Sequence, residues 1–234
     1  MKAGVVIFPG SNCDKDTIHV LQDVYGLQTI SLWHKDTDLQ GCDIIFIPGG
    51  FSFGDYLRAG AVARFSPMMD RVMEFGKNGG YIIGICNGFQ VLCESHLLPG
   101  VLRRNVSQKF TCKNVWIKSV TADSLITRGI PVGQPLKIPI AHAEGSFYAA
   151  PQVLEELQSN DQILFRYCGP NGEIAEEFNP NGSLEDIAGI CNKERNIFGM
   201  MPHPERASEE ALGNTDGRFI FDSIFKEVEA QLEH

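Results

Sequence analysis

The chain has 234 residues, a formal net charge of −9, 43% hydrophobic residues and 21% charged residues. These values are ordinary for a globular protein, and they exclude a disordered, collagen-like or coiled-coil chain and a disulfide-rich miniprotein. The acidic balance argues against binding to nucleic acid or to an anionic membrane surface. Residues 151–234 hold 6 basic and 17 acidic side chains. We therefore expect a solvated acidic surface there, or a docking face for a basic partner.

The seven cysteines are odd in number and include no CxxC pair, so neither a disulfide framework nor a zinc site of that kind is expected. The apolar start, residues 1–10, is short and is followed by polar residues, so it predicts a first strand rather than a signal peptide. No apolar stretch reaches the length of a membrane span. These features predict a protein of the reducing cytoplasm without a metal site.

The first half alternates short apolar runs with stretches of helical periodicity. Strands are predicted at Gly4–Phe8, Thr29–Trp33, Asp43–Ile47 and Tyr81–Ile85, and helices at Thr17–Tyr25, Pro67–Gly76 and from Asn87 to about Ser95. This alternation predicts a parallel sheet with helices on both faces. Because ligands bind beyond the carboxyl ends of strands in such sheets, we expect the glycine-rich turns there to carry the chemistry.

The second half changes to a succession of strands. They are predicted at Val115–Val120, Leu136–Ile140, Ile163–Cys168, Ile174–Phe178, Ile187–Cys191 and Ile197–Met201. The Asn171-Gly172 pair predicts a hairpin between the third and the fourth of these strands. The meander predicts an antiparallel extension of the same sheet rather than a separate domain. An amphipathic helix is expected at Phe219–Leu232.

The sharpest motif, Gly84-Ile85-Cys86-Asn87-Gly88, lies where a predicted strand runs directly into a predicted helix. A side chain in so tight a turn is held out from the sheet, and the flanking glycines permit a strained backbone. Amide groups at the N-terminus of the following helix favour a thiolate over a thiol. Cys86 is therefore a candidate nucleophile, and the alternative is a buried structural cysteine beside a glycine turn.

A cysteine nucleophile needs a base, and the base needs a group that orients it. In His203-Pro204-Glu205 the outer side chains of an extended backbone project to the same side. Glu205 can then hold one ring nitrogen of His203 while the other faces Cys86. By itself a surface ion pair explains this tripeptide equally well. Together with the cysteine turn, it predicts the catalytic group Cys86, His203 and Glu205.

The third requirement is an oxyanion hole, a set of amide donors for the charge that develops on the substrate oxygen. Gly50 and Phe51 follow the strand predicted at Asp43–Ile47, and Asn87 and Gly88 open the helix after the nucleophile. The backbone amides of these four residues are the candidate donors. A plain loop also explains the first pair, and the two interpretations are compatible.

Two common nucleotide-binding motifs are missing from the sequence. No two glycines are separated by a single residue, which excludes GxGxxG, and no G-x-x-x-x-G-K-[ST] loop occurs. Any ATP must therefore be bound by another chain. His142-Ala143-Glu144 repeats the His-x-Glu pattern but lacks further ligands at zinc spacing. We expect a polar loop that borders the site there rather than a metal site.

The run from Gly84 to Gln90, with Cys86 at its centre, and the late His203-Pro204-Glu205 resemble the class I, or triad, glutamine amidotransferases. Further stretches resemble the glutaminase subunit of phosphoribosylformylglycinamidine synthase: Phe8–Asp14, Pro48–Arg64, Arg104–Ser107 and Ala141–Gly145. The triad positions show no departure from the pattern. The resemblance implies a flavodoxin-like α/β fold and a single amidotransferase domain over residues 1–234.

The resemblance also implies a mechanism and partners. Cys86 attacks the side-chain amide of glutamine, and His203 protonates the departing ammonia and then activates water. Ammonia passes to a separate synthetase subunit, which uses ATP, with magnesium, to convert formylglycinamide ribonucleotide into formylglycinamidine ribonucleotide in purine synthesis. A small third subunit joins the complex, and this chain holds no cofactor. The weaker candidates for glutamine contacts are Gln90, Asn105, Ser107 and Phe110.

Two other functions stay open at this point. One is a different cysteine hydrolase on the same kind of sheet, such as a γ-glutamyl hydrolase or a peptidase-like relative. The run Gly50–Arg64 argues against it, because nothing in that chemistry requires this run. The other is a binding module that has lost the reaction, which the presence of all three triad residues argues against. The acidic region 151–234 and the segment Ser52–Arg64 are both candidates for docking the synthetase.

Overall fold

A nine-stranded sheet runs through the middle of the molecule, with strand order β2-β1-β3-β4-β11-β10-β9-β6-β7. The computed structural model describes residues 1–232. Five neighbouring strands are parallel: β2 (Gln28–Trp33), β1 (Lys2–Ile7), β3 (Ile44–Ile47), β4 (Tyr81–Ile85) and β11 (Ile197–Met200). Four antiparallel strands extend them: β10 (Ile187–Cys191), β9 (Ile163–Cys168), β6 (Thr111–Ser119) and β7 (Pro135–His142). The predicted parallel sheet with an antiparallel extension is confirmed.

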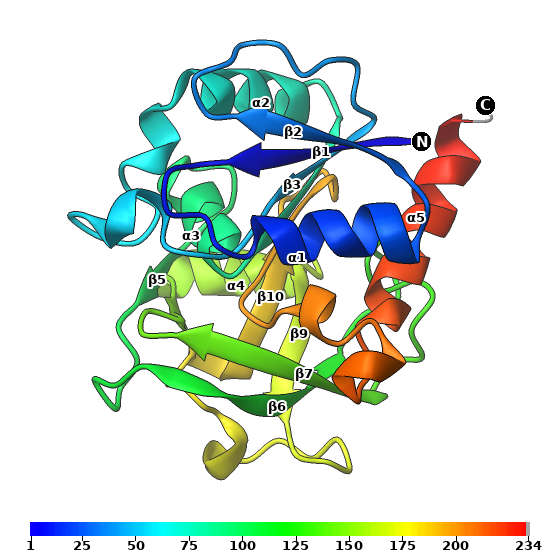
Figure 1. Cartoon of the computed structure of the whole chain (residues 1–234). Helices are drawn as coiled ribbons and strands as arrows, with labels where there is room; N and C mark the ends of the chain where they lie inside the picture. Colours follow the sequence, from blue (N-terminus) through cyan, green and yellow to red (C-terminus); the bar gives the residue numbers. More distant parts are fainter. Residues whose placement is uncertain (233–234) are drawn as a thin grey trace.

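Helices cover both faces of the parallel half (Figure 1). α1 (Asp14–His19), which continues as a π-helix over Val20–Val24, lies on the same face as α5 (Arg218–Leu232). α2 (Pro67–Lys77) and α3 (Asn87–Glu94) lie on the other. The side chains of β3 explain this arrangement, because neighbouring residues of a strand point to opposite faces. The ring of Phe46 packs against Phe221 of α5, whereas Ile47 meets Gly88 of α3.

The central parallel strands form the core. All four residues of β3 are buried, and so are the last four of β4 and all four of β11. A parallel strand covered on both faces has no solvent side, so its sequence is a continuous apolar run rather than an alternation. This is why Ile44–Ile47 and Ile197–Met200 could be identified as strands from composition alone.

The predicted hairpin after β9 is wrong. Residues 174–178, all of which the structure describes, contain no strand, and Glu176–Phe178 forms a 3₁₀ helix. The amide of Gly169 donates to the carbonyl oxygen of Glu173 at 2.8 Å, so the Asn-Gly sequence closes a local turn. Both edges of β9 are already paired, with β10 and β6. A further strand beside β9 would have no backbone partner there.

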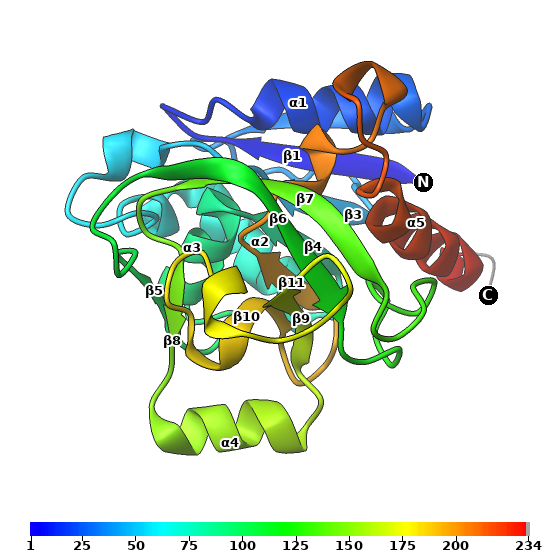
Figure 2. The same ribbon diagram turned by 90° about the horizontal axis from the view of Figure 1, so that it is seen from below.

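Three elements were not predicted from the sequence. The short strands β5 (Val101–Arg103) and β8 (Ser146–Tyr148) pair in a separate two-stranded sheet. Helix α4 (Pro151–Ser159) follows β8, and α4 and α1 lie on opposite sides of the sheet (Figure 2). Strands of three residues carry too little pattern to be recognised, since the side-chain period of two is barely completed. Among the described residues, no helix is both long and apolar enough to cross a membrane.

Candidate functional site

Cys86 sits in the single-residue junction between β4 and α3, with φ 51° and ψ −104°. An L-residue rarely adopts this conformation, and such strain persists where the surrounding structure fixes it. The neighbours explain how it is fixed. A Cβ on Gly88 would lie 1.9 Å from the carbonyl oxygen of Ile47, and one on Gly84 would lie 2.5 Å from Leu92. Only glycines at these positions let α3 approach the sheet closely enough to hold the turn.

Two adjacent parallel strands bring Cys86 and His203 together. β11 lies beside β4, with Met200 opposite Ile85, and the amide of Cys86 donates to the carbonyl oxygen of Met200 at 2.7 Å. The chain after β11 reaches His203 three residues later, where its amide donates to the carbonyl oxygen of Pro139 at 2.8 Å. The carboxyl ends of neighbouring parallel strands meet at one edge of the sheet, so residues 117 positions apart become neighbours.

Glu205 orients His203 as the sequence predicted. A carboxylate oxygen of Glu205, Oε1, lies 2.5 Å from Nδ1 of His203, and the two side chains are 0% and 1% exposed. Burial lowers the pKa of His203, but the nearby charges of Glu205 and Cys86 outweigh it and raise the pKa to about 10. The arrangement therefore holds a protonated imidazole beside the sulfur of Cys86, where it can donate a proton.

The predicted oxyanion donors differ in their availability. Asn87 and Gly88 occupy the first turn of α3, where amides lack a partner within the helix. The amide of Phe51 is engaged, because it donates to the carbonyl oxygen of Gly10 at 3.0 Å. The backbone amide of Gly50 has no such bond to the rest of the described chain. In this conformation the free donors are therefore those of Gly50 and of the first turn of α3, and Phe51 is excluded.

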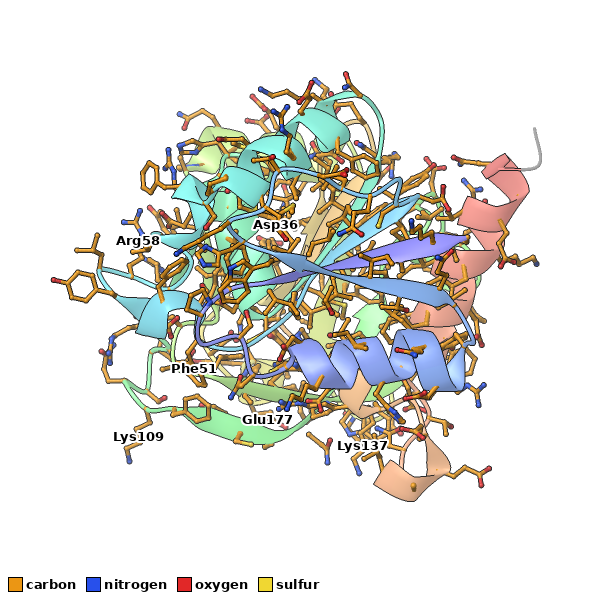
Figure 3. The ribbon with its side chains drawn as sticks, turned by 45° about the horizontal axis from the view of Figure 1, so that its top comes forward. Asp36, Phe51, Arg58, Lys109, Lys137 and Glu177 are labelled. Atoms are coloured by element: carbon orange, nitrogen blue, oxygen red, sulfur yellow. The ribbon has the colours of Figure 1, made fainter. Side chains whose placement is uncertain are left out.

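A cavity of about 270 Å³ opens beside Cys86. It is lined by Gly50, Phe51, Gly54, Asp55, Cys86, Gln90, Arg104, Ala141, His142, Ala143 and Glu144. This volume lies just below the usual range for drug-sized ligands, about 300–1,000 Å³, and suits a single amino acid. Phe51, which borders the cavity, lies on the same side of the molecule as Arg58 and Lys109 (Figure 3). The site reaches the surface on that side.

Of the four residues predicted to contact glutamine, only Gln90 lines this cavity. Its side chain is already held at both ends. Its amide nitrogen donates to the carbonyl oxygen of Glu144 at 2.6 Å, and its oxygen accepts from Asn87 at 2.9 Å. Gln90 therefore fixes the 142–144 loop against α3. Both ends of its side chain are already hydrogen-bonded within the protein, although the side chain lines the cavity.

Asn105, Ser107 and Phe110 lie elsewhere. Asn105 is fully buried, and its side chain bonds to the carbonyl oxygens of Lys109 and His142 and to the amide of Gly145. Ser107 is exposed and accepts from the amide of Lys109. Phe110 borders a second, smaller cavity that Cys86 does not line. The prediction that these three contact glutamine is not supported, because their atoms are consumed by backbone groups or lie outside the cavity.

Four charged or ionisable side chains line the cavity: His142 and Glu144, from the loop that the sequence predicted to border the site, and Asp55 and Arg104, which sequence reasoning had not assigned to it. Arg104 and Glu144 face each other at 3.9 Å. Burial, and then the charge of Glu144, raise the pKa of Asp55 to about 6. Burial, and then the charge of His203, lower the pKa of His142 to about 4, so His142 is neutral. Arg104 and Glu144 both belong to stretches that carried the family resemblance, and their opposite charges were the signal available.

A buried cluster of three side chains adjoins the triad. The sulfur of Cys13, a ring nitrogen of His203 and a carboxylate oxygen of Glu205 lie within 4.8 Å of one another. Burial, and then the charge of Glu205, raise the pKa of Cys13 to about 12. These are residue types that bind transition metals, although the sequence predicted no metal site.

Known proteins are similar in sequence to this chain over nearly its whole length. Residues 1–219 match the CobB/CobQ-like glutamine amidotransferase domain. The phosphoribosylformylglycinamidine synthase subunit PurQ of Chlorobium chlorochromatii is 54% identical over 225 residues, which are 96% of either chain. The subunit of the same name from Koribacter versatilis is 55% identical over 224 residues, covering 96% of this chain and 97% of the relative.

Solved structures agree with the sequence comparison. A chain in the structure of PurLQS from Thermotoga maritima is 39% identical and superposes with a TM-score of 0.86, covering 97% of this chain and 98% of that chain. A putative GMP synthase chain from Thermoplasma acidophilum, at 16% identity and a TM-score of 0.61, covers 100% of this chain and shares the fold. This chain therefore belongs to the family of phosphoribosylformylglycinamidine synthase glutaminase subunits.

Proposed function

We propose that this chain hydrolyses glutamine through a thioester on Cys86 and delivers the ammonia to a synthetase subunit of phosphoribosylformylglycinamidine synthase. The observation that carries the proposal is the joint geometry of Cys86, His203 and Glu205 at the edge of the cavity. Packing of the fold alone does not require these three features to lie together: a strained turn at Cys86, a buried imidazole, and a carboxylate 2.5 Å from that imidazole. Together they make a nucleophile, a proton donor and an orienting group.

The mechanism follows from the protonation of the three side chains. The sulfur of Cys86 attacks the amide carbon of the glutamine side chain, and its electron pair forms the carbon–sulfur bond. The carbon–nitrogen bond then breaks, and His203, whose raised pKa keeps it protonated, gives its proton to the leaving ammonia. The neutral imidazole next takes a proton from water, which attacks the thioester and releases glutamate.

The transient negative charge on the substrate oxygen needs preorganised donors. The amide of Gly50 and the amides of Asn87 and Gly88 are the groups we assign to it, because the Phe51 amide is engaged with Gly10. The positive φ of Gly50, 130°, and the 2.6 Å that would separate its Cβ from the amide nitrogen of Asn12 explain why glycine occupies this position.

The charged walls of the cavity fit the other end of glutamine. Its α-carboxylate pairs with Arg104, and its α-ammonium pairs with Asp55 and Glu144. Asp55 supports this assignment, because one of its oxygens is buried and has no hydrogen-bond partner among the described residues. An ammonium group at that oxygen would satisfy it and would lower the raised pKa of Asp55. Gln90 contributes by fixing Glu144.

The remaining parts of the reaction belong to the complex. ATP and magnesium bind on the synthetase subunit, a small third subunit joins the assembly, and residues 1–234 act as a single amidotransferase domain. The similar chain in the structure of PurLQS from Thermotoga maritima supports an assembly of this kind. The cytoplasm suits the chemistry, because all seven cysteines are free thiols and Cys86 must stay reduced.

A labelling experiment tests the nucleophile and the substrate together. The chain is treated with a chloroketone analogue of glutamine, with and without excess glutamine, and the adduct is mapped by mass spectrometry. We expect modification of Cys86 that glutamine suppresses. Cys112, the exposed cysteine, is the internal control and should gain no glutamine-sensitive label. Labelling of Cys86 that glutamine does not suppress, in the chain alone and with the synthetase present, would contradict the proposal.

A further inference from the structure

A second cavity lies beside His203 and apart from the nucleophile. It measures about 150 Å³ and is lined by Asn12, Cys13, Gly50, Phe51, Phe110, Ala141, His203 and Arg206. Cys86 is not among these residues, although the larger cavity beside Cys86 shares Gly50, Phe51 and Ala141 with it. The catalytic imidazole can therefore be approached by a small solute that does not contact the nucleophile.

Cys13 and His203 line this second cavity, and Glu205 lies directly beside the His203 ring. Their sulfur, nitrogen and oxygen atoms lie within 4.8 Å of one another, and all three residues are buried. Among residues 1–232 no other group of three such side chains comes this close. Gly49 makes room for two of them, because a Cβ there would lie 2.7 Å from His203 and 3.2 Å from the sulfur of Cys13.

We propose that Cys13, His203 and Glu205 form an inhibitory binding site for a zinc ion. Thiolate sulfur, imidazole nitrogen and carboxylate oxygen are the protein ligands of Zn²⁺, and three of them leave a fourth tetrahedral position for water. The small cavity supplies space for that water. The proposal deepens the proposed function of the triad, since the inhibition depends on that function while the binding of the ion does not.

The geometry needs small adjustments that side-chain rotation can supply. Bonds of about 2.0–2.3 Å in a tetrahedron place ligand atoms roughly 3.3–3.6 Å apart. Because all three ligand atoms lie within 4.8 Å of one another, the sulfur of Cys13 needs to move inward by at most about 1 Å, and His203 must separate slightly from Glu205. The second carboxylate oxygen of Glu205 is buried without a hydrogen-bond partner in the described part of the chain, so it is free to turn towards an ion.

Arg206 acts on the site in two opposing ways. Its Nη2 lies 3.0 Å from the sulfur of Cys13, where it stabilises a thiolate but repels a cation. The same guanidinium is held 3.0 Å from Asp16, at a partly exposed position. It can therefore keep this ion pair and turn outward when the ion enters. The thiol proton of Cys13 and the proton on the His203 ring nitrogen that takes the metal both leave to solvent as the ion binds.

Occupation of the site would stop glutamine hydrolysis without blocking the cysteine. The ion would bind the carboxylate of Glu205, which orients His203. It would also bind one nitrogen of the His203 imidazole, the group that must give a proton to the leaving ammonia. Ammonia-driven synthesis uses neither group, so the synthetase reaction would continue. This separates the proposed site from metal binding at the nucleophile, where Cys86 itself would be a ligand.

Cobalt binding to the Cys86→Ala chain tests the site without the nucleophile. Co²⁺ replaces Zn²⁺ in such sites and gives a thiolate-to-cobalt absorption band. We expect one ion per chain and a clear band in Cys86→Ala, the same in the matched control Cys86→Ala/Cys112→Ser, and no band in Cys86→Ala/Cys13→Ser. A band that survives the loss of Cys13, or that needs Cys86, would overturn the proposal.

A second measurement does not require the Cys13 variant to fold. X-ray absorption on zinc-loaded Cys86→Ala should report one sulfur among light-atom ligands, and an all-oxygen and nitrogen shell would contradict the site. In the assembled complex, Zn²⁺ should inhibit glutamine-driven synthesis and spare ammonia-driven synthesis. Cys13→Ser should raise the half-inhibitory zinc concentration at least tenfold. Failure of the glutamine-protected labelling of Cys86 would count against the proposed function alone.

Discussion

At the scale of single residues, the site pairs two histidines with opposite protonation. His203 is held protonated by Glu205 and Cys86, whereas His142, buried and close to that charge, is held neutral. The neutral ring donates one hydrogen bond, from its Nδ1 to the side-chain oxygen of Asn105, at 3.1 Å. The neutral state of His142 therefore depends in part on the charge of His203, because a second charge in this buried region would be costly.

His142 should make the protein sensitive to acid. Its pKa rises from about 4 in the folded chain to 6.5 on unfolding, so the unfolded chain binds the extra proton between these values. Its contribution to the free energy of unfolding is present above pH 6.5 and is lost as the pH falls towards 4. As the pH falls to 4, the free energy of unfolding should therefore decrease by about 3 kcal/mol less in His142→Asn than in the wild-type chain.

Denaturant unfolding at pH 7 and pH 4 measures the effect. His96→Asn, at an exposed histidine, is the matched control and should follow the wild-type pH dependence. An unchanged pH dependence in His142→Asn would show that the buried ring is protonated in the folded chain.

Arg104 should determine glutamine affinity rather than the chemical step. It lies in the cavity wall and pairs only loosely with Glu144, at 3.9 Å. Arg104→Gln in the assembled complex should raise the KM for glutamine about tenfold with little change in kcat, since it removes a contact that is equal in the ground and transition states. Arg103→Gln is the control, because the Arg103 guanidinium stacks on Tyr148 outside the cavity. Equal KM values for the two variants would remove Arg104 from the glutamine site.

At the scale of elements, the approach of α3 to the sheet sets the position of the nucleophile. Gly88 of α3 contacts the backbone of β3, and the amide of Ser52 donates to the side chain of Asn87 at 3.1 Å. The helix is thus fixed at its first turn by both a close backbone contact and a hydrogen bond. Cys86 has no freedom to relax while these contacts hold.

Gly88→Ala should separate α3 from β3. The new Cβ would meet the carbonyl oxygen of Ile47 at 1.9 Å, which backbone movement alone can relieve. The free energy of unfolding should fall by about 1–3 kcal/mol or more, and the glutamine-protected labelling of Cys86 should be lost. Gly129→Ala, whose Cβ would meet the hydroxyl of Ser223 at 3.1 Å, is the control for the loss of a glycine. Chemical unfolding measures the free energy of unfolding of both variants, and labelling measures the glutamine-protected modification of Cys86. Equal results for the two variants would contradict this role of Gly88.

The residues at constrained turns could be predicted from the sequence, because the turn itself sets their geometry. The contacts that depend on tertiary packing could not be predicted in this way. The junction at Cys86 and the His203-Pro204-Glu205 sequence each carry their geometry locally, so the candidate triad could be predicted from sequence. Asn105 looked like a substrate contact because it is polar and lies in a family stretch. Only the fold shows that its side chain is used up by buried backbone groups.

The same distinction explains the strands. The apolar runs of β3 and β11 are recognisable because a strand buried on both faces needs them. The supposed strand at Ile174–Phe178 had the pattern and the turn but no free edge beside it, since β9 pairs on both sides. The hydrophobic pattern of a segment does not indicate whether another strand has a free edge for it to pair with.

At the scale of the whole molecule, the glutaminase serves a reaction on another chain. Cys86→Ala should abolish glutamine-driven synthesis by the assembled complex and leave ammonia-driven synthesis intact, because free ammonia bypasses the thioester. Rates with glutamine and with an ammonium salt measure the two activities. Cys112→Ala, at an exposed cysteine, should retain both. Retained glutamine-driven synthesis in Cys86→Ala would assign the nucleophile elsewhere.

The strand β11 is the last of the sheet along the chain, yet it lies between β4 and β10 in the sheet. A growing polypeptide therefore carries two unjoined halves of the sheet until residues 197–200 are made. Completion of the sheet then requires the insertion of a central strand, a step between segments distant in sequence and hence slow. That same strand brings in His203. An unfinished chain thus holds its nucleophile without a proton donor, and it cannot consume glutamine before its sheet is closed.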